Sequence, residues 1–221
     1  MAVEKMSFIE SFLDLLFPPK CPFCRTLLEK GELWCPECQR KLPWLVGTAG
    51  ERKVELTGGC ASALHYEGTV RKAIHRYKFS GVRAYSKAFG VLTAQAALDH
   101  GFTADLVSWP SVSKKRLRER GYDQGELLAR EVGKQLGLPV LRTVDKAHRP
   151  AQSGIEDKDQ RRANLLGAYT AVEPENFAGK TVLLVDDVLT TGATLSECAK
   201  TLLLAGAGAV CCVTLARVGE R

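Results

Sequence analysis

The chain has 221 residues, which is enough for one ordinary domain with a small appendage. Hydrophobic residues make up 45% of it, so composition allows a buried core, and the formal charge of +6 favours anionic ligands such as phosphates or nucleic acid. No apolar run approaches the length of a membrane span, and Glu4, Glu10 and Asp14 interrupt the apolar region that a secretory signal needs. We therefore expect a cytoplasmic protein without membrane insertion, whose cysteines are reduced.

The first 59 residues divide into three stretches. Residues 4–17 predict a short amphipathic helix, because apolar side chains recur at helical spacing until Pro18 and Pro19 end the pattern. A cysteine-containing module follows, and we assign residues 1–45 to one N-terminal unit. Residues 46–59 are rich in glycine and charge, which is typical of a linker. A new pattern begins at residue 60 and defines a second domain, residues 60–221.

The second domain alternates between strand patterns and helical spacing. The predicted strands are residues 61–66, 106–109, 140–144, 167–172, 181–185 and 209–216. The predicted helices are residues 68–79, 84–100, 124–136 and 194–204. Residues 146–164 carry many charges and few apolar side chains, which predicts a long loop or lid. Strands alternating with helices imply an α/β fold, whose mainly parallel sheet is covered on both faces.

Two Cys-x-x-Cys pairs predict a metal site in the N-terminal module. The pairs are Cys21–Cys24 and Cys35–Cys38, separated by ten residues. Each pair forms a tight turn with two thiolates, and two such turns complete a tetrahedral four-sulfur site. Because the protein fills all four positions, we predict structural zinc, whose binding stabilises a segment too short for an adequate core. A redox pair or two disulfides is the alternative, and the matched pairs in a cytosolic chain favour zinc.

The strongest functional pattern runs from residue 182 to residue 194. Four apolar residues lead to two adjacent aspartates, and a loop of hydroxyls and glycine then opens a helix. The helix N-terminus offers backbone N–H groups and a positive dipole end to a phosphate. The aspartates can accept hydrogen bonds from ribose hydroxyls and can position magnesium through its waters. The residues assigned to phosphate and ribose binding are Asp186, Asp187, Thr190, Thr191, Gly192, Ala193 and Thr194.

This run resembles the phosphoribosyl pyrophosphate motif of type I phosphoribosyltransferases, and no Gly-x-x-x-x-Gly-Lys or Gly-x-Gly-x-x-Gly motif competes with it. Three further segments resemble the ComF/GntX family, which joins a four-cysteine zinc module to that fold. They are residues 66–81, 115–129 and 152–169. This chain has Tyr122-Asp123 where the family more often has Phe-Asn, and Trp109–Ser113 where the family has a Pro-Val-Pro-like sequence. The resemblance implies a type I phosphoribosyltransferase-like, doubly wound, mainly parallel sheet with a small N-terminal zinc-ribbon-like module.

The resemblance also implies where pyrophosphate binds. By analogy, the loop after Trp109 meets the pyrophosphate, and the lid of residues 146–164 reaches over the leaving group. The basic residues assigned to pyrophosphate or to nucleic acid are Lys78, Lys115, Arg116, Arg120, Arg161 and Arg162. Five of the seven residues 114–120 are basic. They form either a solvated loop beside an anion site or a footprint for pyrophosphate or nucleic acid.

Two functions agree with these features. The first is an enzyme that transfers a phosphoribosyl group from phosphoribosyl pyrophosphate with magnesium and releases pyrophosphate. The alternative is a non-catalytic competence factor that binds single-stranded DNA or a nucleotide, whose zinc module docks a partner such as a competence helicase. The complete acidic pair favours the enzyme, because binding a nucleic-acid backbone does not require it. The sequence is compatible with an oligomer and indicates no particular acceptor.

Overall fold

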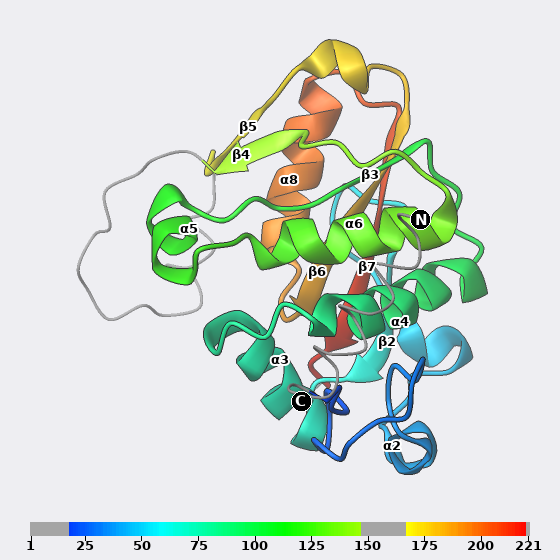
Figure 1. Ribbon diagram of the computed structural model, residues 1–221. Coiled ribbons are helices and arrows are strands. Elements are labelled where there is room, and N and C mark those ends of the chain that lie inside the picture. The colour runs from blue at the N-terminus through cyan, green and yellow to red at the C-terminus, as the bar shows by residue number, and fades with distance from the viewer. Residues whose placement is uncertain (1–17, 147–166, 220–221) are drawn as a thin grey trace, which may run out of the picture. The chain divides into compact units, whose positions relative to one another are not determined.

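The computed structural model describes residues 18–146 and 167–219 (Figure 1). The helix expected over residues 4–17 and nearly all of the lid expected over residues 146–164 lie outside the described residues. The chain divides into two compact units, residues 1–42 and residues 43–221. This division falls three residues before the predicted end of the N-terminal unit at residue 45.

The described part of the N-terminal unit, residues 18–42, is built from two short turns and one helix. An antiparallel bridge between Lys20 and Leu27 closes the first turn, and α2 (Pro36–Lys41) follows the second. Cys35 is the N-cap of α2, and its sulfur accepts a hydrogen bond from the Cys38 backbone N–H. Pro36 at the first helical position suits a helix start, because its fixed φ is helical and no N–H is needed there. The local sequence therefore folds each Cys-x-x-Cys pair into a turn.

The second unit contains a five-stranded sheet in the order β1-β2-β7-β6-β3. Its central strands β7 (Ala209–Arg217) and β6 (Thr181–Leu189) are long and apolar, as strands buried on both faces must be. The strands β2 (Cys60–His65) and β3 (Leu106–Ser108) flank them, and these four strands are parallel. The mainly parallel α/β sheet predicted from the sequence is confirmed.

Helices cover both faces of this sheet. On one face α4 (Tyr85–Asp99) and α6 (Gln124–Leu136) pack against each other and against the strands (Figure 1). On the other face α8 (Ala193–Leu204) buries Leu195, Cys198 and Leu202 against alternate strand residues such as Leu184 and Cys212. Alternate residues of a strand point to opposite faces, so the neighbours of Leu184 and Cys212 face α4 and α6.

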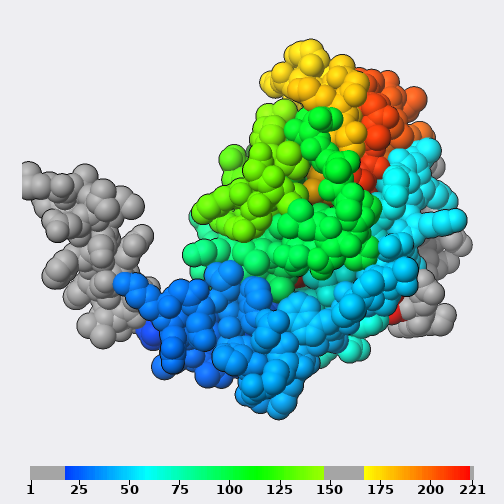
Figure 2. All heavy atoms as spheres, turned by 90° about the vertical axis from the view of Figure 1, so that its right-hand side faces the viewer, coloured from blue at the N-terminus to red at the C-terminus, as the bar shows by residue number. Residues whose placement is uncertain are grey.

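The remaining elements lie around the sheet. Helix α3 (Gly68–Phe79) follows β2, and α5 (Lys114–Arg120) follows β3. A separate antiparallel pair, β4 (Val144–Lys146) and β5 (Tyr169–Ala171), packs on α8. The short 3-10 helix η2 (Pro174–Asn176) precedes β6, and its turn meets the end of α8 through a bridge between Ala178 and Ala207 (yellow beside orange-red in Figure 2).

Three parts of the second unit differ from the sequence-based expectation. Residues 46–59, expected to be a linker, contain the 3-10 helix η1 (Gly47–Gly50) and β1 (Glu51–Arg52), which pairs antiparallel with β2. Residues 114–120, considered as a loop, form helix α5, because Ser113 caps its start and Gly121 ends it at a φ of 73°. Residues 140–144 pair with β3 only at Val140, and strand β4 begins at Val144.

Candidate functional site

The two adjacent aspartates lie near the carboxyl end of β6. The strand continues to Leu189, four residues beyond the predicted end at residue 185, so both acids lie within β6, and Asp186 pairs with Thr214 of β7. The Asp187 side chain is 4% exposed and Asp186 is partly buried. The carboxyl ends of parallel strands form the edge at which open α/β sheets bind ligands. The sheet therefore fixes two carboxylates at that edge.

Lys78 of α3 forms an ion pair with Asp187. Its ammonium nitrogen lies 2.7 Å from Asp187 Oδ1. Burial alone lowers the pKa of Lys78, but the charges on Asp187 and Asp186 raise it above its ordinary value. The second carboxylate oxygen of Asp187 is buried and has no hydrogen-bond partner among the described residues. An unsatisfied buried carboxylate oxygen is costly, and a donor such as a ribose hydroxyl or a metal-bound water would satisfy it.

The environment of Asp186 differs from that of its neighbour. Burial and the neighbouring negative charge of Asp187 together raise the pKa of Asp186 to about 7, against the lowering effect of Lys78. Two carboxylates side by side cannot both ionise easily without a cation nearby. The pair is therefore suited to a ligand that brings hydroxyl donors and a divalent cation.

A tight loop connects β6 to α8. Thr190 and Thr191 are exposed, and Gly192 has a φ of 80°, in the left-handed region that favours glycine. The Thr191 hydroxyl accepts a hydrogen bond from the Ala193 backbone N–H at 3.3 Å. Because α8 begins at Ala193, the loop ends on the first N–H groups of a twelve-residue helix, with Thr194 in its first turn. This arrangement provides the N–H and hydroxyl donors that a phosphate group requires.

Part of residues 46–59, which the sequence predicts to be a linker, packs on this loop. Arg52 Nη1 donates a hydrogen bond of 2.9 Å to the Thr190 carbonyl. A side-chain carbon placed on Gly192 would lie 3.2 Å from Val54 Cγ2, so the backbone of the loop approaches Val54 closely. The sequence alone does not predict this contact of Arg52, because the contact joins residues that are 138 positions apart.

Asp123 organises the chain after β3. Its Oδ1 accepts hydrogen bonds from the backbone N–H groups of Gly125 and Glu126 and caps α6. Its Oδ2 accepts hydrogen bonds from Trp109 Nε1 at 3.2 Å and from the Val112 N–H at 3.1 Å. One carboxylate thus fixes both the loop after Trp109 and the start of α6.

The predicted basic residues fall into three places. Lys78 joins the acidic pair, whereas Lys115 and Arg116 are exposed on α5. Arg120, at the end of α5, donates a hydrogen bond to Gln124 Oε1 and stacks its guanidinium over the Phe79 ring. Arg161 and Arg162 lie outside the described residues. The roles of all six in pyrophosphate or nucleic-acid binding stay predictions.

Lys146 is a basic residue whose position the sequence did not reveal. Its ammonium nitrogen lies 5.5 Å from the centre of the Tyr169 ring, between β4 and β5. Burial lowers the pKa of Lys146, and the nearby charge of Arg116 lowers it further. Strands β4 and β5 pack on α8, the helix that follows the phosphate loop, so the start of the predicted lid lies on the same side of the sheet as that helix.

The four cysteines of the N-terminal unit form one cluster. The sulfur atoms of Cys21, Cys24, Cys35 and Cys38 all lie within 4.8 Å of one another, and the structure contains no disulfide among them. Tetrahedral zinc with Zn–S bonds of about 2.3 Å separates its sulfurs by roughly 3.8 Å, which this cluster can match with small shifts. Burial raises the pKa of Cys38, and the neighbouring thiols raise it further, so ionising the set needs a cation. The cluster is consistent with structural zinc and leaves no position for a catalytic water.

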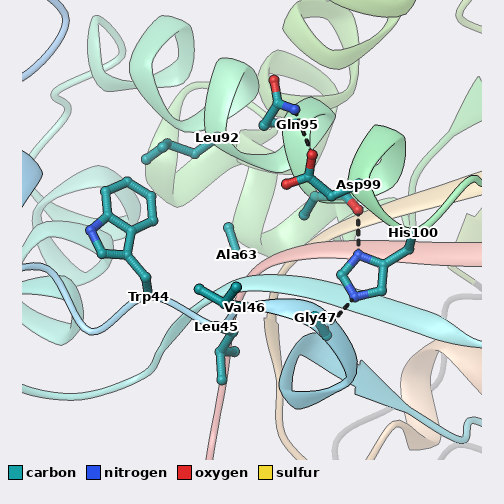
Figure 3. Close-up of a pocket in the computed structure, with 10 residues that line it drawn as sticks. Trp44, Leu45, Val46, Gly47, Ala63, Leu92, Gln95, Asp99 and His100 are labelled. Atoms are coloured by element: carbon teal, nitrogen blue, oxygen red, sulfur yellow. Dashed lines mark hydrogen bonds between the residues drawn. The ribbon is translucent and has the colours of Figure 1, made fainter.

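A separate cavity of about 320 Å³ lies between α4, β2 and η1 (Figure 3). Trp44, Leu45 and Leu92 contribute much of its apolar lining. At its polar end the His100 ring hydrogen-bonds the carbonyl groups of Ala96 and Gly47. None of the residues Asp186–Thr194 lines it. A phosphate site at a helix N-terminus is shallow and made of backbone donors, so cavity size is a poor guide to it here.

Comparisons with known proteins agree with this organisation. Residues 12–52 match the model of the double zinc ribbon domain, and residues 122–221 match the model of the phosphoribosyl transferase domain. Competence protein F of Haemophilus influenzae is 31% identical over 194 residues, covering 83% of this chain and 78% of that protein. The chain belongs to the ComF/YhgH family.

Other relatives carry related names. Competence protein ComFC of Bacillus subtilis is 30% identical over 71% of this chain, which spans 63% of the length of that relative. DNA utilization protein YhgH of Escherichia coli K12 is 28% identical over 86% of this chain and 80% of its own length. The family architecture is therefore a four-cysteine zinc ribbon followed by a phosphoribosyltransferase-like α/β domain, as the sequence predicts.

Solved structures give a more distant likeness. The allosteric regulatory enzyme of purine biosynthesis has a TM-score of 0.44 at 20% identity, covering 63% of this chain and 29% of that chain. Glutamine phosphoribosylpyrophosphate amidotransferase from Bacillus subtilis has a TM-score of 0.43 at 21% identity, with 62% and 30% covered. Similarity at this level says nothing about the reaction of the ComF/YhgH chain. No helix in the described part of the chain is long and apolar enough to span a membrane.

Proposed function

We propose that the chain is a phosphoribosyltransferase that binds phosphoribosyl pyrophosphate with magnesium and transfers its ribose 5-phosphate group to an acceptor. The observation that carries the proposal is the sequence of parts along β6 and α8. Asp186 and Asp187 lie at the carboxyl edge of the sheet, and the loop Thr190–Gly192 leads from them into the N-terminus of α8. The match to the phosphoribosyl transferase domain model supports this proposal.

The loop would hold the 5-phosphate. Its donors would be backbone N–H groups at the start of α8 and the hydroxyls of Thr190, Thr191 and Thr194, and α8 adds its dipole. Gly192 would let the loop take the shape that holds the phosphate, because glycine adopts a φ of 80° without strain and leaves room for Val54 beside the loop.

The two aspartates would hold the ribose. Asp187 Oδ2 is buried and has no hydrogen-bond partner within residues 18–146 and 167–219, so a ribose hydroxyl that donates to it would remove the free-energy cost of that unsatisfied oxygen. Lys78 occupies Oδ1 of the same residue, and it must shift if a second hydroxyl is to be accepted there. Asp186, with its raised pKa, would ionise once magnesium and its waters approach.

Transfer would break the bond between the anomeric carbon and the pyrophosphate oxygen. Pyrophosphate leaves with the bonding electron pair, and the nucleophilic atom of the acceptor forms the new bond to that carbon and releases its proton. Magnesium, when bound, supplies positive charge to the leaving pyrophosphate. The carboxylates lie where they can stabilise positive charge that grows on the ribose. Arg116 of α5, with Arg161 and Arg162 of the lid, would neutralise the leaving group, as the sequence suggests.

Binding of phosphoribosyl pyrophosphate tests the proposal directly. Isothermal titration with magnesium should give micromolar affinity for the wild-type protein and no measurable binding for Asp186→Asn/Asp187→Asn. Glu175→Gln, an exposed carboxylate on η2, is the matched control and should bind as wild type does. The proposal is wrong if folded, zinc-loaded wild type binds no phosphoribosyl pyrophosphate. Radiolabelled pyrophosphate release in the presence of candidate acceptors then tests catalysis.

A second candidate function is binding of single-stranded DNA. Phe79 is 61% exposed at the end of α3, with the Arg120 guanidinium carbon 4.8 Å above its ring and the His75 ring centroid also 4.8 Å away. Exposed aromatic and guanidinium planes beside the basic helix α5 are the kind of surface on which bases stack. The relatives named for competence and DNA utilization support this candidate.

An oligonucleotide titration separates the two candidates. Fluorescence anisotropy with an unstructured single strand should show binding that weakens steeply with salt, and Phe79→Ala should weaken it by roughly ten-fold, as loss of one stacked base predicts. Leu98→Ala removes a similarly exposed apolar side chain on α4 and should leave binding unchanged. Equal effects of the two substitutions would exclude a stacking role for Phe79.

A further inference from the structure

We propose that Arg52, outside the phosphoribosyl motif, is a phosphate-binding residue that supplies the positive charge this motif lacks. The inference rests on the proposed function and extends it to a residue of the segment before β2. It concerns the 5-phosphate end of the ligand and not the pyrophosphate end.

The first support is the direct contact with the loop. Arg52 Nη1 lies 2.9 Å from the Thr190 carbonyl oxygen, and both groups are at the surface. An arginine carries five N–H donors in a planar fork, and this is the one hydrogen bond of the Arg52 side chain to the described residues. The other donors remain available to a second acceptor close to Thr190.

The second support is that the segment carrying Arg52 is fixed on the loop. Arg52 pairs with Cys60 in the β1–β2 register, and Val54 is buried in the same hydrophobic cluster as Leu189 and Leu195. A Cβ placed on Gly192 would lie 3.2 Å from Val54 Cγ2, so this segment packs directly on the loop. The buried Val54 and the strand pairing of Arg52 therefore keep the guanidinium beside the loop.

The third support is charge. The run Asp186–Thr194 contains two carboxylates and no basic side chain. A phosphate ester brings further negative charge to this edge, and helix dipoles alone contribute only about half an elementary charge. The charge of Lys78 is already compensated by its ion pair with Asp187. A guanidinium beside Thr190 places a permanent cation where the phosphate is expected, and the planar fork of an arginine is suited to bidentate contact with a phosphate.

The test compares three variants of the full-length, zinc-loaded protein. Arg52→Gln removes the charge, Arg52→Lys keeps the charge without the fork, and Lys53→Gln removes the charge of the exposed neighbouring residue as a matched control. Binding of ribose 5-phosphate and of pyrophosphate is measured by calorimetry at two salt concentrations, with neutral ribose as a reference ligand.

Arg52→Gln should weaken ribose 5-phosphate binding at least ten-fold, reduce its salt dependence and leave pyrophosphate binding unchanged. Arg52→Lys should restore part of the affinity, and Lys53→Gln should behave as wild type. Unchanged ribose 5-phosphate affinity in Arg52→Gln overturns the inference but leaves the proposed function standing. A weakened affinity with the full salt dependence retained also overturns it, because Arg52 would then only hold the Thr190 carbonyl. A wild-type protein that binds neither phosphoribosyl pyrophosphate nor ribose 5-phosphate overturns both.

Discussion

Lys78 of α3 and Asp187 of β6 form an ion pair of 2.7 Å in which the lysine side chain is 25% exposed and the carboxylate 4%. The pair joins a helix that follows β2 to the strand that carries the acidic motif. Breaking a buried pair leaves one charge without compensation, which costs more than the pair itself contributes.

Lys78→Met should therefore lower the free energy of unfolding by about 3–5 kcal/mol, since it leaves the Asp187 carboxylate buried and alone. Lys78→Met/Asp187→Asn should lose less than the sum of the single changes. Urea denaturation measures the free energy of unfolding of Lys78→Met, Asp187→Asn and the double variant. Lys115→Met, which breaks an exposed pair with Glu119, is the control and should change stability by about 0–1 kcal/mol. Additive single effects would show that Lys78 and Asp187 are not coupled in solution.

The raised pKa of Asp186 predicts how stability depends on pH. With its pKa at about 7, the folded chain keeps this proton to a higher pH than the unfolded chain does. Between about pH 4 and pH 7 the folded state binds more protons, so the free energy of unfolding falls as pH rises. Asp186→Asn removes this contribution and should melt above wild type at pH 8 without ligand. Glu175→Gln should show the wild-type profile, and identical profiles for Asp186→Asn and wild type would contradict the assignment.

Local patterns predicted much of this fold. The helices α3 and α6 have the predicted bounds, because their apolar spacing and the glycine ending α6 are local signals. Helix α5 was missed because it has no apolar stripe: its one large apolar residue, Leu117, is 44% exposed, and its caps alone mark it. The sequence predicts that strand β6 ends at residue 185, four residues too early, because two adjacent acids inside a strand resemble the start of a loop.

The candidate site was predicted only in part for a related reason. The acids and the loop are contiguous in sequence, so their pattern is visible there. The partners that complete the site come from elsewhere. Lys78 reaches Asp187 across more than one hundred positions, and Arg52 reaches Thr190 across 138. No periodicity or spacing rule records such contacts, which depend on how the strands order in the sheet.

Zinc in the N-terminal unit leads to a stability prediction of its own. The protein should contain one zinc ion per chain, and Cys38→Ser should lose it, because a four-sulfur site tolerates no missing ligand easily. Removal of zinc from the wild-type protein with a chelator should make residues 20–42 sensitive to protease, while the unit that contains the five-stranded sheet stays resistant. Atomic emission and limited proteolysis measure both effects. Cys211→Ser, which alters a thiol in β7 far along the chain, is the control and should retain zinc. Full zinc content in Cys38→Ser would rule out the four-cysteine site.

Gly192 allows the phosphate loop to turn, and a matched glycine isolates that role. Gly192→Ala places a Cβ at a φ of 80° and 3.2 Å from Val54 Cγ2. Gly137→Ala has a similar φ of 68° at the end of α6 but meets no atom within 4 Å. Both changes should cost about 1–2 kcal/mol of backbone strain. Only Gly192→Ala should also reduce ribose 5-phosphate binding in calorimetry, by ten-fold or more. If both variants bound ribose 5-phosphate equally well, phosphate binding would not depend on the close approach of Gly192 to Val54.

Asp123 gives the last prediction, because one side chain caps α6 and holds the loop after Trp109. Asp123→Ala removes four hydrogen bonds, and the lost cap alone costs about 1–2 kcal/mol. Asp123→Asn keeps an oxygen for the Gly125 and Glu126 N–H groups, but its NH₂ group cannot accept from Trp109 or Val112.

Thermal unfolding should therefore rank the proteins as wild type, then Asp123→Asn, then Asp123→Ala. Indole fluorescence of Trp109 should change in both variants, since both lose the bond to Nε1. Pyrophosphate binding should weaken in both as well, because the loop after Trp109 is expected to meet the pyrophosphate. If Asp123→Asn matched wild type in fluorescence and pyrophosphate binding, Asp123 would act only as the cap of α6, and the loop would depend on other contacts for its position.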